Sequence, residues 1–191
     1  MSNDQSKYRV YTLDGTGQYL GGWTPTHPVT EFPQPSAVRL PPNARVRIDV
    51  LASGSEPSTR APELALYAAD GAAQSVSDLV LTSTTAARMP WSAGRRLLRE
   101  TTVFALRVEM SASGDSIEVR ARRPDGSIEP LLLIREFTAQ WQTPYVLRRP
   151  LTLPGGSVIE ATAHVTGSDP PPQFAVHVQA FEPTVNAVHT K

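Results

Sequence analysis

The sequence contains no cysteine, which excludes a disulfide, a thiolate nucleophile and a zinc–thiolate site. It also lacks an excess of charge of either sign, because eighteen Lys and Arg residues balance eighteen Asp and Glu residues. No strong electrostatic field therefore draws in nucleic acid or a membrane surface. We expect no nucleic-acid partner.

Long apolar runs are missing as well. No window holds eighteen consecutive apolar residues, so we expect this chain to have no transmembrane segment of its own. The first residues show no basic stretch followed by an apolar one, so no signal peptide is visible. The cytoplasmic side is therefore the default location.

Lysine is scarce, because Lys7 and Lys191 are the two lysines and sixteen of the eighteen basic residues are arginine. Arginine suits fixed, bidentate contacts better than lysine does. Proline and glycine are plentiful, with eighteen and twelve residues. Such dense punctuation favours short strands and turns over long helices.

The clearest strand pattern lies in residues 104–111, where Phe104, Leu106, Val108 and Met110 alternate with more polar residues. This period of two is typical of a half-buried strand. Turns are expected at residues 124–127 and 154–156, which are rich in proline and glycine. Similar patterns predict strands at residues 8–13, 45–51, 63–69, 79–84, 117–122, 131–134, 159–165 and 174–181.

Specific residues accompany this series of strands and turns. They are Met110, Gly114, Pro124-Asp125-Gly126, Leu131-Leu132, Trp141-Gln142, Tyr145, Leu147, Pro150, Leu153-Pro154 and Thr162-Ala163-His164. In this order they resemble the C-terminal half of the copper type II, ascorbate-dependent monooxygenases, the peptidylglycine hydroxylating monooxygenase family. The resemblance implies an all-β fold, an antiparallel, jelly-roll-like β-sandwich with a complete second half and an abbreviated first half. It also implies that Trp141 and Tyr145 are buried.

The copper ligands of that family are not kept. The resemblance places its His-x-His pair, two imidazoles on one strand face, at Glu109 and Ser111. Its His-Tyr position falls at Leu51-Ala52, or at Val50-Leu51 if the gap lies elsewhere, and no methionine follows Met110 to act as the last ligand. We therefore expect no copper, no cofactor and no enzymatic activity.

The expected domain organisation has four parts. Residues 1–85 form the abbreviated half and include a proline-rich arm at 24–42, which is either ordered by its apolar anchors or a flexible linker. Residues 86–100 connect the halves, residues 101–182 form the C-terminal sandwich half, and residues 183–191 form an extended tail. The connector carries Trp91, Arg95, Arg96 and Arg99, which form either a docking patch for an acidic partner or part of a solvated linker.

The leading functional hypothesis is a non-catalytic accessory or structural subunit that uses the sandwich as a docking surface. Its protein partners would belong to a larger, membrane-associated complex of the respiratory or photosynthetic type. When a fold is retained although its metal ligands have been lost, we expect its surface to carry the function. One alternative is a metal site at His164 and His177, which could meet on a solvent-facing sheet surface. Another is a small-ligand site in the vacated copper cleft.

Overall fold

The computed structural model describes residues 8–13, 19–23, 29–52, 63–69, 71, 73–82, 91–111, 113–139, 143–165 and 173–182. Every regular element among them is a strand, and none forms a helix that could cross a lipid bilayer. The tail at 183–191, the start of the proline-rich arm and Trp141 lie outside these residues. The chain divides into two compact units, residues 1–75 and 76–191.

The first unit contains a three-stranded antiparallel sheet in the order β2-β1-β4. Its strands are β1 (Tyr8–Leu13), β2 (Tyr19–Trp23) and β4 (Arg47–Ala52). A short strand, β3 (Ser36–Ala37), pairs in parallel with Gln74 and Ser75 at the start of β5 (Gln74–Thr82).

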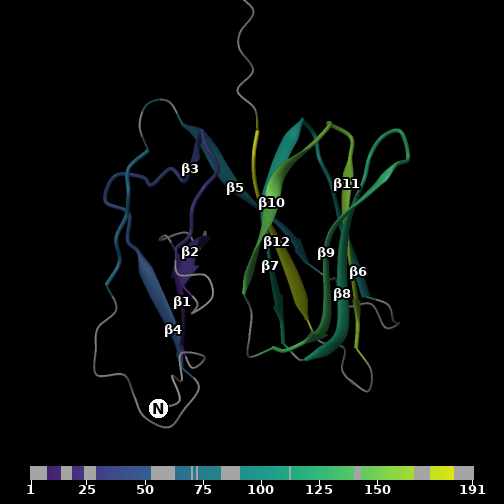
Figure 1. The fold of residues 1–191 in the computed structure, drawn as a ribbon, viewed down its shortest axis with the longest axis horizontal. Helices are drawn as coiled ribbons and strands as arrows, with labels where there is room; N and C mark the ends of the chain where they lie inside the picture. The colour runs from purple at the N-terminus through teal and green to yellow at the C-terminus, as the bar shows by residue number, and fades with distance from the viewer. Residues whose placement is uncertain are drawn as a thin grey trace, which may run out of the picture. The chain divides into compact units, whose positions relative to one another are not determined.

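The second unit is a sandwich of two sheets, each with four antiparallel strands from this unit (Figure 1). The short strand β3 extends one of these sheets beside β5 as a fifth strand. One sheet has the order β10-β7-β12-β5 and the other the order β6-β11-β8-β9. Numbered along the chain, these orders are those of an eight-stranded jelly roll made of two Greek keys. The remaining strands are β6 (Trp91–Arg96), β7 (Thr101–Met110), β8 (Gly114–Arg122), β9 (Ile128–Phe137), β10 (Pro144–Leu153), β11 (Val158–His164) and β12 (Phe174–Phe181).

The core of the sandwich lies between its two sheets. Leu106, Val108 and Met110 of β7 are buried there, as the alternation in the sequence predicts. Their counterparts on β11 are Ile159, Ala161 and Ala163, each with no measurable exposure. The alanines on β11 are small, so the two sheets can pack closely there. The two packed sheets of strands confirm the all-β sandwich expected from the sequence. The expected half-buried strand is nevertheless wrong for β7, because its other face is buried too, with Arg107 only 6% exposed.

The predicted turn at residues 124–127 is confirmed as well. Gly126 has φ of 86°, which glycine adopts without steric cost. The Asp125 carboxylate accepts hydrogen bonds from the Ser127 backbone N–H and hydroxyl, at 2.9 and 2.6 Å. These two bonds hold the pKa of Asp125 below its ordinary value.

The domain limits differ from those expected. The boundary falls between residues 75 and 76, ten residues before the predicted one. Residues 91–96 of the predicted connector form β6, which pairs with β11 throughout its length. The predicted strand at residues 63–69 is wrong, because no strand among the described residues pairs with it.

Candidate functional site

The residues at the positions where the resemblance places copper ligands make contacts with other side chains or backbone groups. Glu109, near the end of β7, pairs with the Arg107 guanidinium. Ser111 exchanges two hydrogen bonds with Gln173, since its N–H donates to the Gln173 carbonyl at 3.0 Å and its hydroxyl accepts from the Gln173 N–H at 3.1 Å. Ser111 therefore holds the start of β12 beside the end of β7. Leu51 lies in β4 of the first unit.

A polar cluster surrounds His177 on β12. Its Nδ1 lies 2.9 Å from Asp78 Oδ2, and its Nε2 lies 3.6 Å from Glu109 Oε2. The imidazole is thus held between two carboxylates, one of which also contacts Arg107. Within the described residues no three His, Cys, Asp or Glu side chains are arranged to hold a metal ion.

His164 and His177 are not brought together. His164 is exposed on β11 between the buried residues Ala163 and Val165. His177 lies on β12 between Val176 and Val178, which are also core residues. Because side chains alternate along a strand, each histidine points away from the core on a different sheet. The two imidazoles therefore lie on opposite outer faces of the sandwich and cannot share an ion.

The predicted docking patch is also dispersed. Trp91 is buried in the core with 4% exposure, so it is not a surface contact. Arg95 donates a long hydrogen bond of 3.5 Å to the Val80 carbonyl of β5. Arg99 pairs with Glu182 at 3.2 Å, and Arg96 is exposed. Arg95 and Arg96 are consecutive in β6 and therefore point to opposite faces of the sheet, while Arg99 lies beyond the end of the strand.

The outer face of the sheet β6-β11-β8-β9 carries an ion-pair network. Glu160 of β11 accepts hydrogen bonds from Arg122 at 2.5 Å and from Arg120 at 3.2 Å. The bond from Arg122 is the main cause that lowers the pKa of Glu160. This network links the two central strands of the sheet.

Tyr145 of β10 is half-buried and packs against the core, and this burial raises the pKa of its phenol.

Residues 63–69, ELALYAA, form a fully exposed segment in the first unit. Leu64, Leu66 and Tyr67 are 42%, 58% and 91% exposed. The segment has the apolar spacing of a strand but no strand partner among the described residues.

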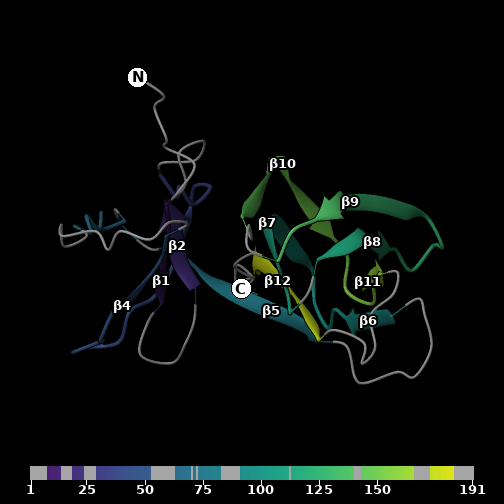
Figure 2. The same cartoon turned by 90° about the horizontal axis from the view of Figure 1, so that it is seen from below.

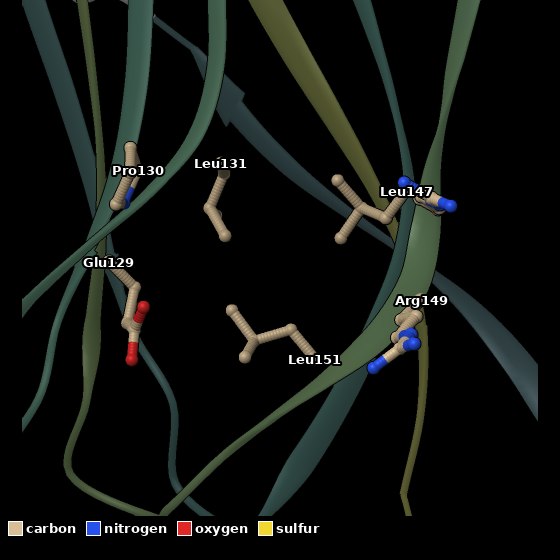
Figure 3. Close-up of a pocket in the computed structure, with 7 residues that line it drawn as sticks. Glu129, Pro130, Leu131, Leu147, Arg149 and Leu151 are labelled. Carbon is tan, nitrogen blue, oxygen red and sulfur yellow. The ribbon is translucent and has the colours of Figure 1, made fainter.

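A pocket of about 470 Å³ opens between β9 and β10, which are edge strands of the two facing sheets (Figure 3). Leu131, Leu147 and Leu151 point into it, while Glu129 lies on the β9 side and Arg149 on the β10 side. Pro130 and Arg148 complete the lining.

Irregular strand pairing shapes this pocket. Val146 pairs with Ala105, and Leu151 pairs with Val103. An advance of five residues along β10 therefore matches an advance of only two residues along β7, and residues 147–150 form a bulge. On β9, Leu132 pairs with Val119 and Pro130 with Arg120, which leaves Leu131 as an extra residue. Bulges re-aim side chains and are common beside functional sites. Both bulged segments contribute a leucine to the pocket wall.

Sequence reasoning did not find the pocket. One signal was present, since Arg148, Arg149 and Pro150 interrupt an otherwise apolar segment. Charges and proline inside a strand pattern indicate an edge strand or a bulge. Their position opposite Leu131 depends on how distant strands pair, which spacing along the chain does not reveal.

No family model matches the chain, and no curated protein matches its sequence. One solved structure to which it is similar is that of tomato aspermy virus, with 13% sequence identity and a TM-score of 0.30. The similarity covers 70% of this chain and 91% of that chain. We draw no functional conclusion from a likeness of this extent.

Proposed function

We propose that this chain is a non-catalytic docking subunit that joins a larger assembly by adding a strand to a partner protein. The observation that supports this function is the exposed segment 63–69. Its sequence has the apolar spacing of a strand, yet Leu64, Leu66 and Tyr67 remain exposed. The edge strand of a partner's β-sheet would supply the inter-strand backbone hydrogen bonds.

Strand addition would satisfy this segment in two ways. The partner's edge would pair with the backbone N–H and C=O groups, which gives affinity. Side chains that alternate along the added strand would enter pockets of the partner, which gives specificity. Leu64 and Leu66 would face one side and Tyr67 the other. The partner in this proposal is therefore a protein with an open β-sheet edge and apolar residues beside it.

The assembly in this proposal is membrane-associated and of the respiratory or photosynthetic type, and the chain is a relative of the copper type II monooxygenases that has lost its ligands. The engagement of Glu109 with Arg107 and of Ser111 with Gln173 is consistent with positions that no longer serve a metal. Size-exclusion chromatography of native extract in mild detergent tests the assembly. Elution as a free monomer, with no co-purifying protein, would contradict it.

A site-directed crosslinking experiment tests the segment itself. The chain has no cysteine, so Leu66→Cys introduces a single thiol for a photo-crosslinker. Leu98→Cys is the matched control, because Leu98 is also highly exposed, at 90%, and lies outside the segment. In native extract we expect a discrete crosslinked product from position 66 and none from position 98. Equal labelling from both positions would contradict docking through residues 63–69.

A proline substitution separates strand addition from simple apolar contact. Leu66→Pro removes one backbone donor and prevents a continuous ladder. Because Leu66 is exposed and outside regular structure, we expect a change in the free energy of unfolding within about 0.5 kcal/mol. The partner should nevertheless be lost in pull-down experiments. Leu66→Ala, which keeps the N–H, should retain more of the partner than Leu66→Pro.

A further inference from the structure

We propose that the pocket between β9 and β10 binds an amphiphilic carboxylate, a ligand with an apolar carbon chain and one anionic head group. This inference concerns the second unit and is independent of the docking function proposed for residues 63–69. The pocket volume of about 470 Å³ falls within the range of about 300–1,000 Å³ typical of small-molecule sites.

The walls of the pocket suit an apolar chain. Leu131 is 8% exposed, while Leu147 and Leu151 are partly buried and pack against the core. Their side chains converge from both strands on the space between them (Figure 3). An apolar chain placed there would remove these leucines and itself from water, which is favourable.

The charges at the rim suit an anionic head group. Glu129 accepts a hydrogen bond from Arg123 Nε at 3.2 Å, so its charge is already balanced. The side chains of Arg148 and Arg149 form no ion pair or hydrogen bond with any residue that the structure describes. Two guanidinium groups that have no partner among the described residues lie beside an apolar pocket, and they complement a carboxylate, which arginine binds in bidentate geometry.

The same rim disfavours an added strand as the occupant. Pro130 lies on β9 and Pro150 on β10, and both flank the pocket region. Proline has no backbone N–H, so each edge lacks a donor where a new strand would have to pair. Recognition at this site therefore depends on the leucine walls and the two arginines rather than on backbone pairing.

Calorimetric titration with decanoate, kept below its micelle concentration, tests the ligand class. Decyltrimethylammonium, with the same chain and a cationic head, is the matched probe. We expect saturable binding of one decanoate per chain and binding of the cation that is weaker by about tenfold or more. Equal affinity for both probes, or no saturable binding of decanoate, would overturn the proposal.

Two sets of variants locate the site. Leu147→Trp fills the pocket and should abolish binding, and Leu151→Phe provides a smaller filling change if the first variant does not fold. The double variant R148Q/R149Q should weaken decanoate binding by about tenfold or more. The double variant R95Q/R96Q on β6 changes the net charge equally and should leave affinity within about twofold. Equal weakening by both double variants, or unchanged binding in the filled variants, would overturn the assignment.

Discussion

The sandwich has two margins, β5–β6 and β9–β10, and they are built differently (Figure 2). The strands β6, β9 and β10 are edge strands, whereas β5 is an edge only beyond Ser75, where its pairing with β3 ends. At the β5–β6 margin, Leu81 and Trp91 are 2% and 4% exposed within the core, and Arg95 reaches across to the Val80 carbonyl. At the β9–β10 margin, two bulges accompany a pocket lined by leucines.

The difference shows two ways of ending a β-sandwich. Trp91 fills the β5–β6 margin, and the exposed Arg95 places a charge at its edge, where charged side chains protect a sheet from unwanted pairing. The β9–β10 margin uses Pro130 and Pro150 for the same protection, because each removes a backbone donor. This second solution leaves space between the sheets. Protection from aggregation and the presence of a pocket are therefore compatible at one edge.

The largest expected effect comes from opening the closed margin. Trp91→Ala should lower the free energy of unfolding by about 3–5 kcal/mol, because it removes a large side chain from the core. Leu147→Ala, at the open margin, should cost only about 1 kcal/mol, since that leucine is partly exposed. Urea denaturation measures both. A cost below about 1 kcal/mol for Trp91→Ala would mean that this tryptophan does not close the margin.

A filling substitution should distinguish the margins in the opposite direction. Leu81→Trp adds volume to a packed site and should destabilise the protein by about 1–3 kcal/mol. Leu147→Trp enters existing space and should change stability by less than about 1 kcal/mol. Thermal unfolding monitored by circular dichroism compares the two. Similar destabilisation would show that the β9–β10 pocket is not free to accept a side chain.

A control for both margins lies in the centre of the sheet, at Glu160. Hydrogen bonds from Arg122 and Arg120 lower the pKa of Glu160 below 4.5 in the folded protein. The ion pair therefore contributes its full stabilisation at pH values above the pKa that Glu160 has in the unfolded chain. This stabilisation is lost as the pH falls through the lower pKa of Glu160 in the folded protein. Glu160→Gln should cost about 0.2–1 kcal/mol at pH 7. This difference should shrink below about pH 4.5. Denaturation at several pH values checks it, and a difference that grows in acid would contradict the assignment.

The smallest effect is expected at Arg95. Its hydrogen bond to Val80 is long and exposed, so Arg95→Ala should change the free energy of unfolding by at most about 1 kcal/mol. Its role in edge protection should appear instead as faster aggregation at high protein concentration, measured by light scattering. Arg149→Ala at the other margin is the control, because Pro150 still protects that edge.

Strands with regular apolar alternation were predictable. The bounds of β1 and β12 match those expected, and β7, β8 and β11 lie within a few residues of the predicted strands. In β7, β8, β11 and β12, residues with a spacing of two meet the core of the sandwich, so the local period of the sequence carries the information. The all-β class follows from these elements together with the proline and glycine turns.

β6 and β10 were not predicted, for physical reasons that differ. β6 contains few apolar residues and Gly94, so its strand state depends on pairing with β11. β10 contains Pro144, Pro150 and two arginines, which break the alternation. Residues 63–69 present the reverse case, because a strand-like pattern does not form a strand without a partner. The predicted burial of Trp141 lies outside the described residues.

Candidate sites were less predictable than strands because they depend on which distant strands are neighbours. His164 and His177 both lie opposite the core-facing residues of their strands, yet those strands belong to different sheets. The contact between His177 and Asp78 joins residues far apart in the chain. No spacing rule within one strand could have indicated either relation.

The position of β12 has a consequence for biosynthesis. It is the last described strand in the chain, yet it lies between β7 and β5 and pairs with both. Its pairing with β5 joins residues about one hundred positions apart, such as Ser77 and Ala180. While the ribosome is still adding earlier residues, β5 and β7 have no strand between them and their facing edges are open. The sheet can therefore close only after β12 has left the exit tunnel, and until then the edges of β5 and β7 that β12 will occupy are exposed to pairing with other chains.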